Sequence, residues 1–237
     1  MKLNSPVIDF HSHILPRVDH GCKSTEVSVS QLSLMREKET DIVVATSHFY
    51  PHVHTPDGFI SKVDGAIQTL KDAQPQNAPK LFVGAEVLVC DNLCDMEGLE
   101  QLCIRGTKTL LLEMPLESGL EKHFETVESL LSDGYMVVLA HIDRYIKKHA
   151  KQIKYMLDMG ALAQINADSL FSFGLRGQVL NVVKHTQSVC ALGSDLHGAD
   201  EKHYLKFASA DKYLGKYAEE IMKRTAKLLD GAVQIEL

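Results

Sequence analysis

The chain has 237 residues and lacks the features that mark several broad classes of protein. No apolar run reaches the roughly 18 residues of a membrane-spanning helix, and the N-terminus carries no basic-then-apolar signal, so we expect a cytoplasmic protein without membrane insertion. Positive charge is not in excess, because 25 Lys and Arg stand against 31 Asp and Glu, a net charge of −6. Proteins that bind the nucleic-acid backbone are usually basic, so this balance argues against nucleic acid as a partner.

Cysteine is scarce, and its spacing forms no motif. The five residues, which contain no Cys-x-x-Cys pair, are Cys22, Cys90, Cys94, Cys103 and Cys190. Their odd number disfavours a disulfide framework. None is followed by Arg six positions later, so the phosphate loop of the cysteine-dependent tyrosine phosphatases is absent. A zinc cluster of Cys90, Cys94 and Cys103 is an alternative, but reduced thiols are the simpler interpretation.

The chain also lacks internal repeats and long linkers, so we expect a single domain over residues 1–237. Short apolar, β-branched runs alternate with amphipathic stretches. The predicted strands cover seven ranges: 7–10, 41–46, 81–86, 109–113, 136–140, 162–166 and 189–193. The predicted helices cover 26–39, 59–72, 121–132, 148–159, 178–186 and 218–229.

This regular alternation predicts an α/β fold with parallel strands and right-handed crossovers. A closed (β/α) barrel would carry its functional groups at the carboxyl ends of the strands. An open doubly wound sheet is the alternative architecture, although no Gly-x-Gly-x-x-Gly follows the first strand. Residues 198–217 have no clear pattern and could form a helix over the site or an oligomer contact.

Metal-ligand side chains stand where the predicted strands end. His11 and His13 follow the first strand, and residues i and i+2 of a strand point to the same face. The pair alone is weak evidence, because a second His-x-His occurs at His52 and His54. Six of the seven predicted strands nevertheless end on His, Glu or Asp, and none ends on Lys. The candidate ligands are His11, His13, His48, Glu86, Glu113, His141, Asp195 and His197.

A charged residue at one strand end has a simple explanation, because chains often reach the surface there. Six together predict a multinuclear metal site. Imidazole and carboxylate donors without thiolate suit Mn²⁺, Fe²⁺ or Zn²⁺. Such a site can polarise a phosphoryl oxygen and lower the pKa of a bound water, which supplies a nucleophile.

The ordered motifs resemble a known superfamily. They are Asp-Phe-His-Ser-His-Ile-Leu-Pro-x-Val-Asp-x-Gly, Ala-Thr-Ser-His, Gly-Ala-Glu-Val, Leu-Leu-Glu-Met-Pro, Ala-His-Ile-Asp-Arg-Tyr and Gly-Ser-Asp-Leu-His. Together they are similar to the polymerase and histidinol phosphatase (PHP) superfamily, and within it to the manganese-dependent protein-tyrosine phosphatases of bacterial capsule loci. The resemblance runs from residue 7 to about 200.

The resemblance implies a distorted seven-stranded, TIM-like (β/α) barrel, the PHP fold, with two or three metal ions. Mn²⁺ is the expected cofactor, with Fe²⁺ or Zn²⁺ as alternatives. One ion would use His11, His13, Glu86 and Asp195; a second would use Glu86, Glu113 and His141; a third would use His48, His197 and the residue before Gly21. Arg144 matches the phosphate-binding arginine of the family. Its neighbour Asp143 would orient it, and Asn166 would form a wall of the site.

Two positions depart from the family pattern. Asp19-His20-Gly21 replaces Asp-Asp-Gly, so the third-metal ligand would be His20, with Asp19 as an alternative. Lys202 stands where a second arginine is common, and lysine brings charge without the planar fork of arginine. The candidate catalytic residues are therefore Arg144, His48 and Lys202.

The leading hypothesis is a phosphomonoesterase that hydrolyses protein phosphotyrosine through attack of metal-bound hydroxide on phosphorus. The resemblance implies, as partner, the tyrosine-rich tail of an autophosphorylating kinase that controls capsular polysaccharide export, and an oligomer is possible. The alternatives are histidinol-phosphate or another small-molecule phosphatase, an amidohydrolase-type hydrolase, and a catalytically silent scaffold.

Overall fold

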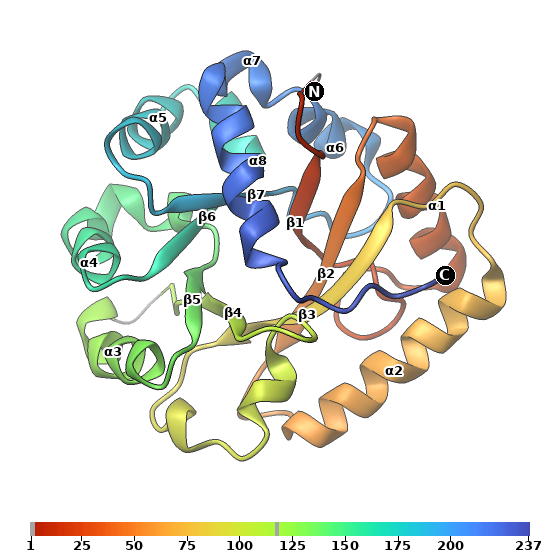
Figure 1. Cartoon of the computed structure of the whole chain (residues 1–237), viewed down its shortest axis with the longest axis horizontal. Coiled ribbons are helices and arrows are strands. Elements are labelled where there is room, and N and C mark those ends of the chain that lie inside the picture. The colour runs from red at the N-terminus through yellow and green to blue at the C-terminus, as the bar shows by residue number, and fades with distance from the viewer. Residues whose placement is uncertain (1–2, 117–118) are drawn as a thin grey trace.

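Seven parallel strands form one sheet in the computed structural model, which describes residues 3–116 and 119–237. Their order in the sheet follows their order in the chain (Figure 1). The strands are β1 (Ile8–Ser12), β2 (Ile42–Phe49), β3 (Lys80–Leu88), β4 (Thr109–Glu113), β5 (Met136–Leu139), β6 (Leu162–Asn166) and β7 (Val189–Gly193).

The sheet closes between its first and last strands. Backbone hydrogen bonds run from Asp195 N to His11 O (2.8 Å) and from His13 N to Leu196 O (3.0 Å), and an isolated parallel bridge pairs Ser12 with Leu196. The sheet is therefore a nearly closed α/β barrel, which confirms the predicted TIM-like fold and rules out the open doubly wound sheet.

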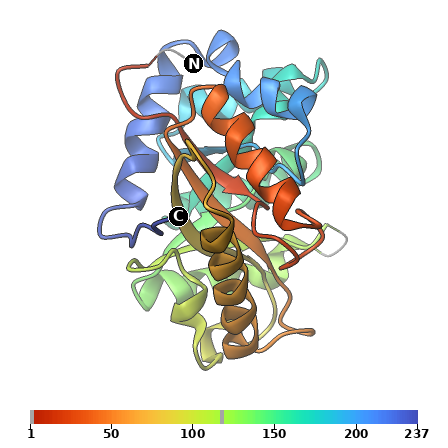
Figure 2. The ribbon, with the colours of Figure 1, turned by 90° about the vertical axis from the view of Figure 1, so that its right-hand side faces the viewer.

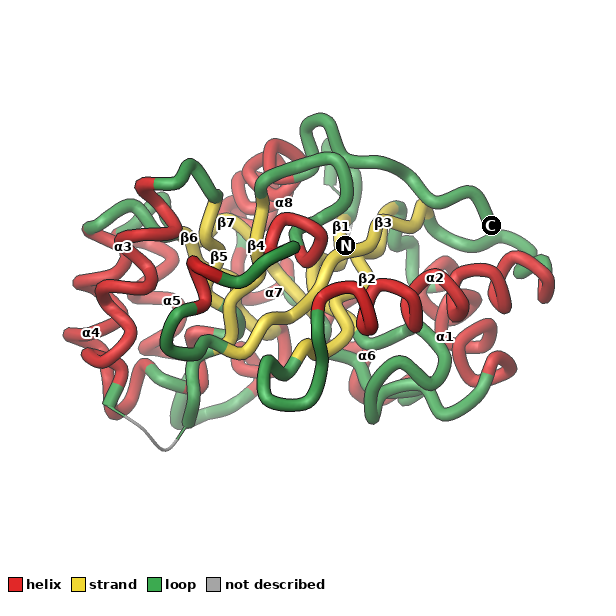
Figure 3. The backbone as a smooth tube through the Cα atoms, turned by 90° about the horizontal axis from the view of Figure 1, so that it is seen from below, coloured by secondary structure: helices red, strands yellow, loops and turns green. Residues whose placement is uncertain are grey.

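Helices follow the strands and surround them (Figure 3). They are α1 (Thr25–Glu37), α2 (Pro56–Ala73), α3 (Phe124–Ser132), α4 (Ile146–Asp158), α5 (Arg176–His185), α6 (Glu201–Ala208), α7 (Asp211–Leu214) and α8 (Lys216–Leu228). Figure 2 shows α1 and α2 side by side outside the first strands. Within the described ranges, no helix is long and apolar enough to cross a membrane.

Local sequence explains where these helices begin. Ser24 caps α1 through Val27 N, and Thr55 caps α2 just before Pro56, whose fixed φ suits the first turn. Asp200 caps α6 by accepting from His203 N. The segment 198–217, which had no clear pattern, thus contains the short helices α6 and α7.

One end of the barrel is covered by α8. On this helix Thr225 Oγ1 donates to Cys190 O (2.8 Å) and Arg224 Nη1 donates to Val189 O (2.7 Å), both at the start of β7. The amino ends of the strands are therefore packed against a helix, and the candidate ligands lie at the opposite, carboxyl end.

Three strands extend further than the sequence predicts. β1 reaches Ser12, β2 reaches Phe49 and β3 reaches Leu88, so His11 and His48 lie inside strands rather than after them, and Glu86 lies inside β3 rather than at its end. The reason is continued pairing, because β2 and β3 stay in register to Phe49 and Val87. Glu86 thus lies between two paired strands, opposite His48 on β2 and Leu111 on β4.

Candidate metal centre

The candidate ligands meet at the carboxyl end of the barrel around the carboxylate of Glu86, which is buried on β3. Its Oε1 lies 2.7 Å from His141 Nε2. Its Oε2 lies 2.8 Å from His48 Nδ1, 3.2 Å from His11 Nε2 and 3.4 Å from His13 Nε2. Glu86 therefore stands where four imidazoles converge, as a bridging ligand must.

A second carboxylate, Asp195, faces the same imidazoles from the end of β7. Its Oδ1 lies 3.3 Å from His13 Nε2 and 3.7 Å from His11 Nε2. Its Oδ2 accepts from Asn166 Nδ2 (2.8 Å) and pairs with Arg144 Nη2. Asn166 is thus a wall of the site, in agreement with the sequence analysis, and it also holds a candidate ligand in place.

Three groups of these side chains have the spacing to hold a metal ion, with one ligand atom per residue within 4.8 Å of the others. The groups are His11 with His13 and Asp195, His48 with Glu86 and Glu113, and His13 with His48 and His197. No cysteine belongs to them within the part of the chain that the structure describes, and all five cysteines are free thiols.

Unpartnered buried atoms support a fit to cations. Among the described residues, buried His141 Nδ1 has no hydrogen-bond partner, and Glu86 Oε2 and His48 Nδ1 lie 2.8 Å apart without the geometry of a hydrogen bond. An unsatisfied buried polar atom is costly, and a cation between carboxylate and imidazole donors removes that cost. The donor set therefore fits divalent metal ions.

Neighbouring groups fix the orientation of three histidines. Gln164 Oε1 accepts a hydrogen bond from the backbone N of His141 (2.6 Å). Because the same oxygen lies 3.1 Å from His11 Nδ1, that ring nitrogen must be the donor of their hydrogen bond. His13 Nδ1 donates to Asp19 Oδ2 (2.7 Å), and His197 Nδ1 donates to the carbonyl oxygen of Asp195 (3.0 Å). Each ring is thereby held through its Nδ1, which leaves Nε2 as the atom that can bind a metal ion in place of its present neighbours.

Charge in the metal-free centre is balanced by protons. Burial alone would lower the pKa of His13, but Asp19, Asp195 and Glu86 raise it to about 10. Burial alone would raise the pKa of Glu86, yet His11 and the other imidazoles hold it well below its usual range. The pKa of Asp195 is likewise lowered against burial by His11 and His13. A divalent cation can take the place of these protons.

Three other ligands behave differently. Burial, followed by the charge of Glu86, raises the pKa of Glu113 to about 7. Burial and the neighbouring His13 lower the pKa of His197 to about 4. Burial also lowers the pKa of His141, despite its contact with Glu86. Both imidazoles are therefore neutral donors at pH 7, which is the form that binds metal.

A cavity of about 420 Å³ opens beside the ligands. Its lining includes Arg144, whose side chain is 37% exposed and lies 3.8 Å from Glu113 Oε1. Asp143, expected to orient Arg144, instead accepts from Asn166 N (2.8 Å). The arginine is held by the carboxylates of Asp195 and Glu113, with its guanidinium reachable from the cavity.

The two departures from the family pattern lie in different surroundings. The ring of His20 lies 4.7 Å from the rings of both His48 and His197, at the mouth of the site. Lys202 is exposed on α6 and does not belong to the described lining of the cavity, whereas its neighbour His203 does. His203 Nε2 bonds Ser194 O (2.8 Å), between β7 and Asp195.

Sequence reasoning missed several supporting residues. Gln164 lies inside an apolar strand, His203 lies in the segment 198–217 that showed no clear pattern, and Asp9 precedes the first ligand pair. Asp9 Oδ1 accepts from Ser194 N (2.8 Å) and so joins β1 to β7, and burial raises its pKa to about 6. The buried polar character of Asp9 and Gln164 inside strands was the available signal. By contrast, His54 packs against Phe49 and Phe59 and takes no part in the site.

Comparison with known proteins agrees with this geometry. A family model described as capsular polysaccharide synthesis, CpsB/CapC, matches residues 7–229. Tyrosine-protein phosphatase CpsB of Streptococcus pneumoniae is 27% identical over 232 residues, 91% of this chain and 94% of the relative. Putative tyrosine-protein phosphatase CapC of Staphylococcus aureus is 28% identical over 225 residues, 91% of this chain and 87% of the relative.

The fold has a close match among solved structures. One chain comes from crystal structures of YwqE from Bacillus subtilis and CpsB from Streptococcus pneumoniae, named as unique metal-dependent tyrosine phosphatases. It superposes with a TM-score of 0.81 at 22% sequence identity and covers 96% of each chain. This likeness shows that the barrel is shared.

Proposed function

Because the chain belongs to the CpsB/CapC family, we propose that it is a metal-dependent phosphatase that hydrolyses protein phosphotyrosine. The observation that carries the proposal is the convergence of four imidazoles on buried Glu86, with Arg144 exposed beside them. The relatives in the family are named tyrosine-protein phosphatases, and the same barrel occurs in metal-dependent enzymes of that kind.

The proposed cofactor is Mn²⁺, in two or three ions. Glu86 would be shared between an ion held with His11, His13 and Asp195 and an ion held with Glu113 and His141. His48, His197 and His20 would hold a third ion. When bound, these cations polarise phosphoryl oxygens and lower the pKa of water toward neutrality.

The protein's own groups would bind and orient the substrate. The guanidinium of Arg144 can grip two phosphate oxygens at once, and the adjacent cavity has room for the rest of the substrate. His48 is proposed as a ligand that also faces the reacting phosphate. Lys202 is proposed as an outer positive charge near the mouth, on its sequence position alone.

Phenolate is an undemanding leaving group, since the pKa of tyrosine is about 10. A protonated histidine or water can therefore supply the proton without a strongly tuned acid. This property is compatible with a phosphotyrosine substrate whichever group at the site supplies the proton.

We further propose a cytoplasmic protein that acts on the tyrosine-rich tail of an autophosphorylating kinase of capsule synthesis. The single seven-stranded sheet supports a single domain over residues 1–237.

The experiment is a substrate panel with metal-replete protein. Phosphate release should be fastest with a phosphotyrosine peptide, and much slower with the matched phosphoserine peptide and with histidinol phosphate. Preference for histidinol phosphate would instead identify a small-molecule phosphatase. Absence of release from all three would remove the phosphatase assignment.

A further inference from the structure

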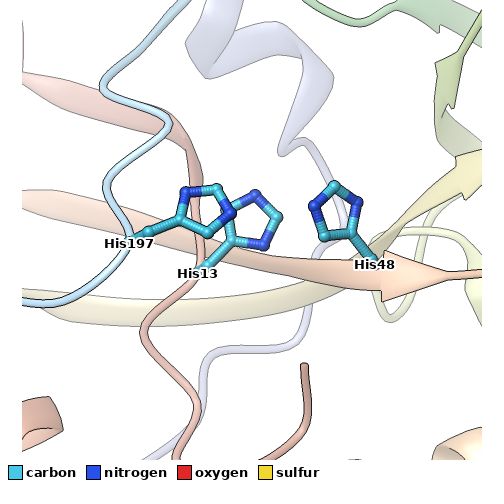
Figure 4. A group of neighbouring side chains, drawn as sticks. All are labelled: His13, His48 and His197. Carbon is cyan, nitrogen blue, oxygen red and sulfur yellow. The ribbon is translucent and has the colours of Figure 1, made fainter. Parts of the chain in front are cut away.

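Beside the two carboxylate-containing groups lies a set of four histidines, here called the imidazole cluster: His13, His20, His48 and His197. The ring of His13 lies 3.9 Å from that of His197 and 4.4 Å from that of His48. Figure 4 shows these three rings gathered from three segments of the chain. His20 adds a fourth ring, 4.7 Å from those of His48 and His197.

The loop after β1 holds His20 against this cluster. Arg17 N donates to Cys22 O (2.8 Å) and Cys22 N donates to His13 O (3.2 Å), so the chain folds back on itself. Gly21 permits this close return, because a Cβ there would meet His13 Cβ and O at 2.5 Å. The residue just before Gly21 is thereby fixed at the mouth of the site.

Asp19, the nearest carboxylate on this loop, is already committed. Its Oδ2 accepts from His13 Nδ1 (2.7 Å) and from His48 N (2.9 Å), and its Oδ1 accepts from Gly21 N (2.9 Å). Three of the roughly four acceptor positions of a carboxylate are therefore used. Asp19 thus orients the ring of His13, holds the backbone of His48 and shapes the loop.

The cluster consequently offers imidazole nitrogens as its only donor atoms. The other two groups each contain at least one carboxylate, Asp195 in one and Glu86 with Glu113 in the other. Carboxylate ligands suit Mn²⁺, whereas imidazole suits Zn²⁺ and its neighbours, and Mn²⁺ is the weakest binder of the first-row series at a given site. Glu86 and Asp195 border the cluster, 2.8 Å from His48 Nδ1 and 3.3 Å from His13 Nε2, but they belong to the other two groups. A group whose own donors are imidazoles alone therefore discriminates against Mn²⁺.

We propose that His20, His48 and His197 of the imidazole cluster bind a Zn²⁺- or Co²⁺-type cation more tightly than Mn²⁺, and that Asp19 positions His13 for the neighbouring ion. The inference rests on the proposed function in taking this site to be a metal site, and it assigns different metal preferences to different parts of it.

The test is calorimetric titration of the chelator-stripped full chain with Mn²⁺ and with Co²⁺, together with the visible absorption of bound Co²⁺. At equal free concentrations of the two metals, wild-type protein should bind one more Co²⁺ ion than Mn²⁺ ions. His20→Ala should weaken that Co²⁺ site at least tenfold, since even a group outside the ligand shell is worth about 10–100-fold in metal affinity. His20→Asp should add the missing Mn²⁺ site.

His52→Ala is the matched control, because His52 is an exposed imidazole on the loop after β2 whose ring lies beside Tyr50 instead of the cluster. It should leave both titrations unchanged. Circular dichroism melts establish that each variant is folded.

Equal Co²⁺ affinity in wild type and His20→Ala, or equal Mn²⁺ stoichiometry in wild type and His20→Asp, overturns the proposal. The outcome is separate from activity. Protein that binds the cations as expected but releases no phosphate from phosphotyrosine keeps this inference and loses the proposed function.

Discussion

Replacing Glu86 with Gln tests the electrostatic core of the site, because it removes one charge and keeps the shape. The carboxylate is buried and lies within 2.7 Å of His141 Nε2, 2.8 Å of His48 Nδ1 and 3.2 Å of His11 Nε2. In metal-free protein it is the anion that the surrounding imidazoles neutralise. With metal present it is the shared ligand of the proposed pair of ions.

The magnitude follows from breaking a buried ion pair. Removing one partner of such a pair costs about 3–5 kcal/mol, because the other charge is left buried and unpaired. A protein of this size loses roughly 2–4 °C in Tm per kcal/mol. We therefore expect metal-free Glu86→Gln to melt about 6–20 °C below metal-free wild type near pH 6.

The loss should depend on pH with a definite sign. Because the pKa of Glu86 lies well below its usual value of 4.5, its contribution is present above that pH and is lost as the pH falls. Because the pKa of His13 is raised from 6.5 to about 10, its contribution is complete below pH 6.5 and is lost as the pH rises toward 10. The variant should thus differ most from wild type between about pH 5 and 6.5, and less at pH 9.

The assay is thermal and urea unfolding of chelator-treated protein at pH 6 and pH 9. Glu128→Gln is the control, because Glu128 is exposed on α3, and it should change Tm by less than about 1 °C, as surface substitutions usually do. Added Mn²⁺ should raise the Tm of wild type and of the control, and much less that of Glu86→Gln. If both metal-free variants have the same Tm as metal-free wild type at pH 6, the Glu86 carboxylate is not the ionised centre of the site and the reasoning fails.

Four further outcomes are expected. Arg144→Lys should lower kcat/KM for phosphotyrosine peptide roughly 10–150-fold, the worth of about 1.5–3 kcal/mol in hydrogen bonds to a charged group, and unchanged kinetics would exclude phosphate binding there. Mn²⁺ affinity should rise from pH 6 to pH 8, with protons released in calorimetry, because His13 must lose its proton to bind metal; a pH-independent affinity would contradict this. Gln164→Leu should weaken metal binding about 10–100-fold by freeing the ring of His11, whereas unchanged affinity would show that the ring needs no such support. Lys202→Ala should raise KM by roughly 1.5–5-fold, as for an exposed charge worth about 0.2–1 kcal/mol, while His203→Ala should instead weaken metal binding; the reverse pattern would exchange their roles.

The order of strands and helices could be predicted because each crossover is short and each strand is apolar. The fold class, the seven strands and the longer helices are confirmed. The ends of β1, β2 and β3 could not be placed, since polar ligands such as His48 interrupt the apolar pattern while the backbone ladder continues past them. The helices α6 and α7 are short, and their apolar residues pack through tertiary contacts that no local pattern reveals.

The site could be predicted to the extent that its ligands end or interrupt strands. Convergence of Glu86 with the imidazoles agrees with the predicted bridging role, although the assignment of ligands to individual ions stays a prediction. The supporting contacts of Gln164, Asp9 and His203 join segments far apart in the chain, so sequence spacing could not indicate them. The expectation of a single domain also stays a prediction.

The most direct test is phosphate release from a phosphotyrosine peptide by chelator-stripped protein before and after Mn²⁺ is added. The structure places six imidazoles and three carboxylates of the candidate ligand set at one end of the barrel with Arg144 beside them, so release should be negligible without metal and restored by Mn²⁺. Glu113→Gln should abolish this restoration. Equal release with and without metal, or from Glu113→Gln and wild type alike, would contradict the central claim that this metal centre performs the hydrolysis.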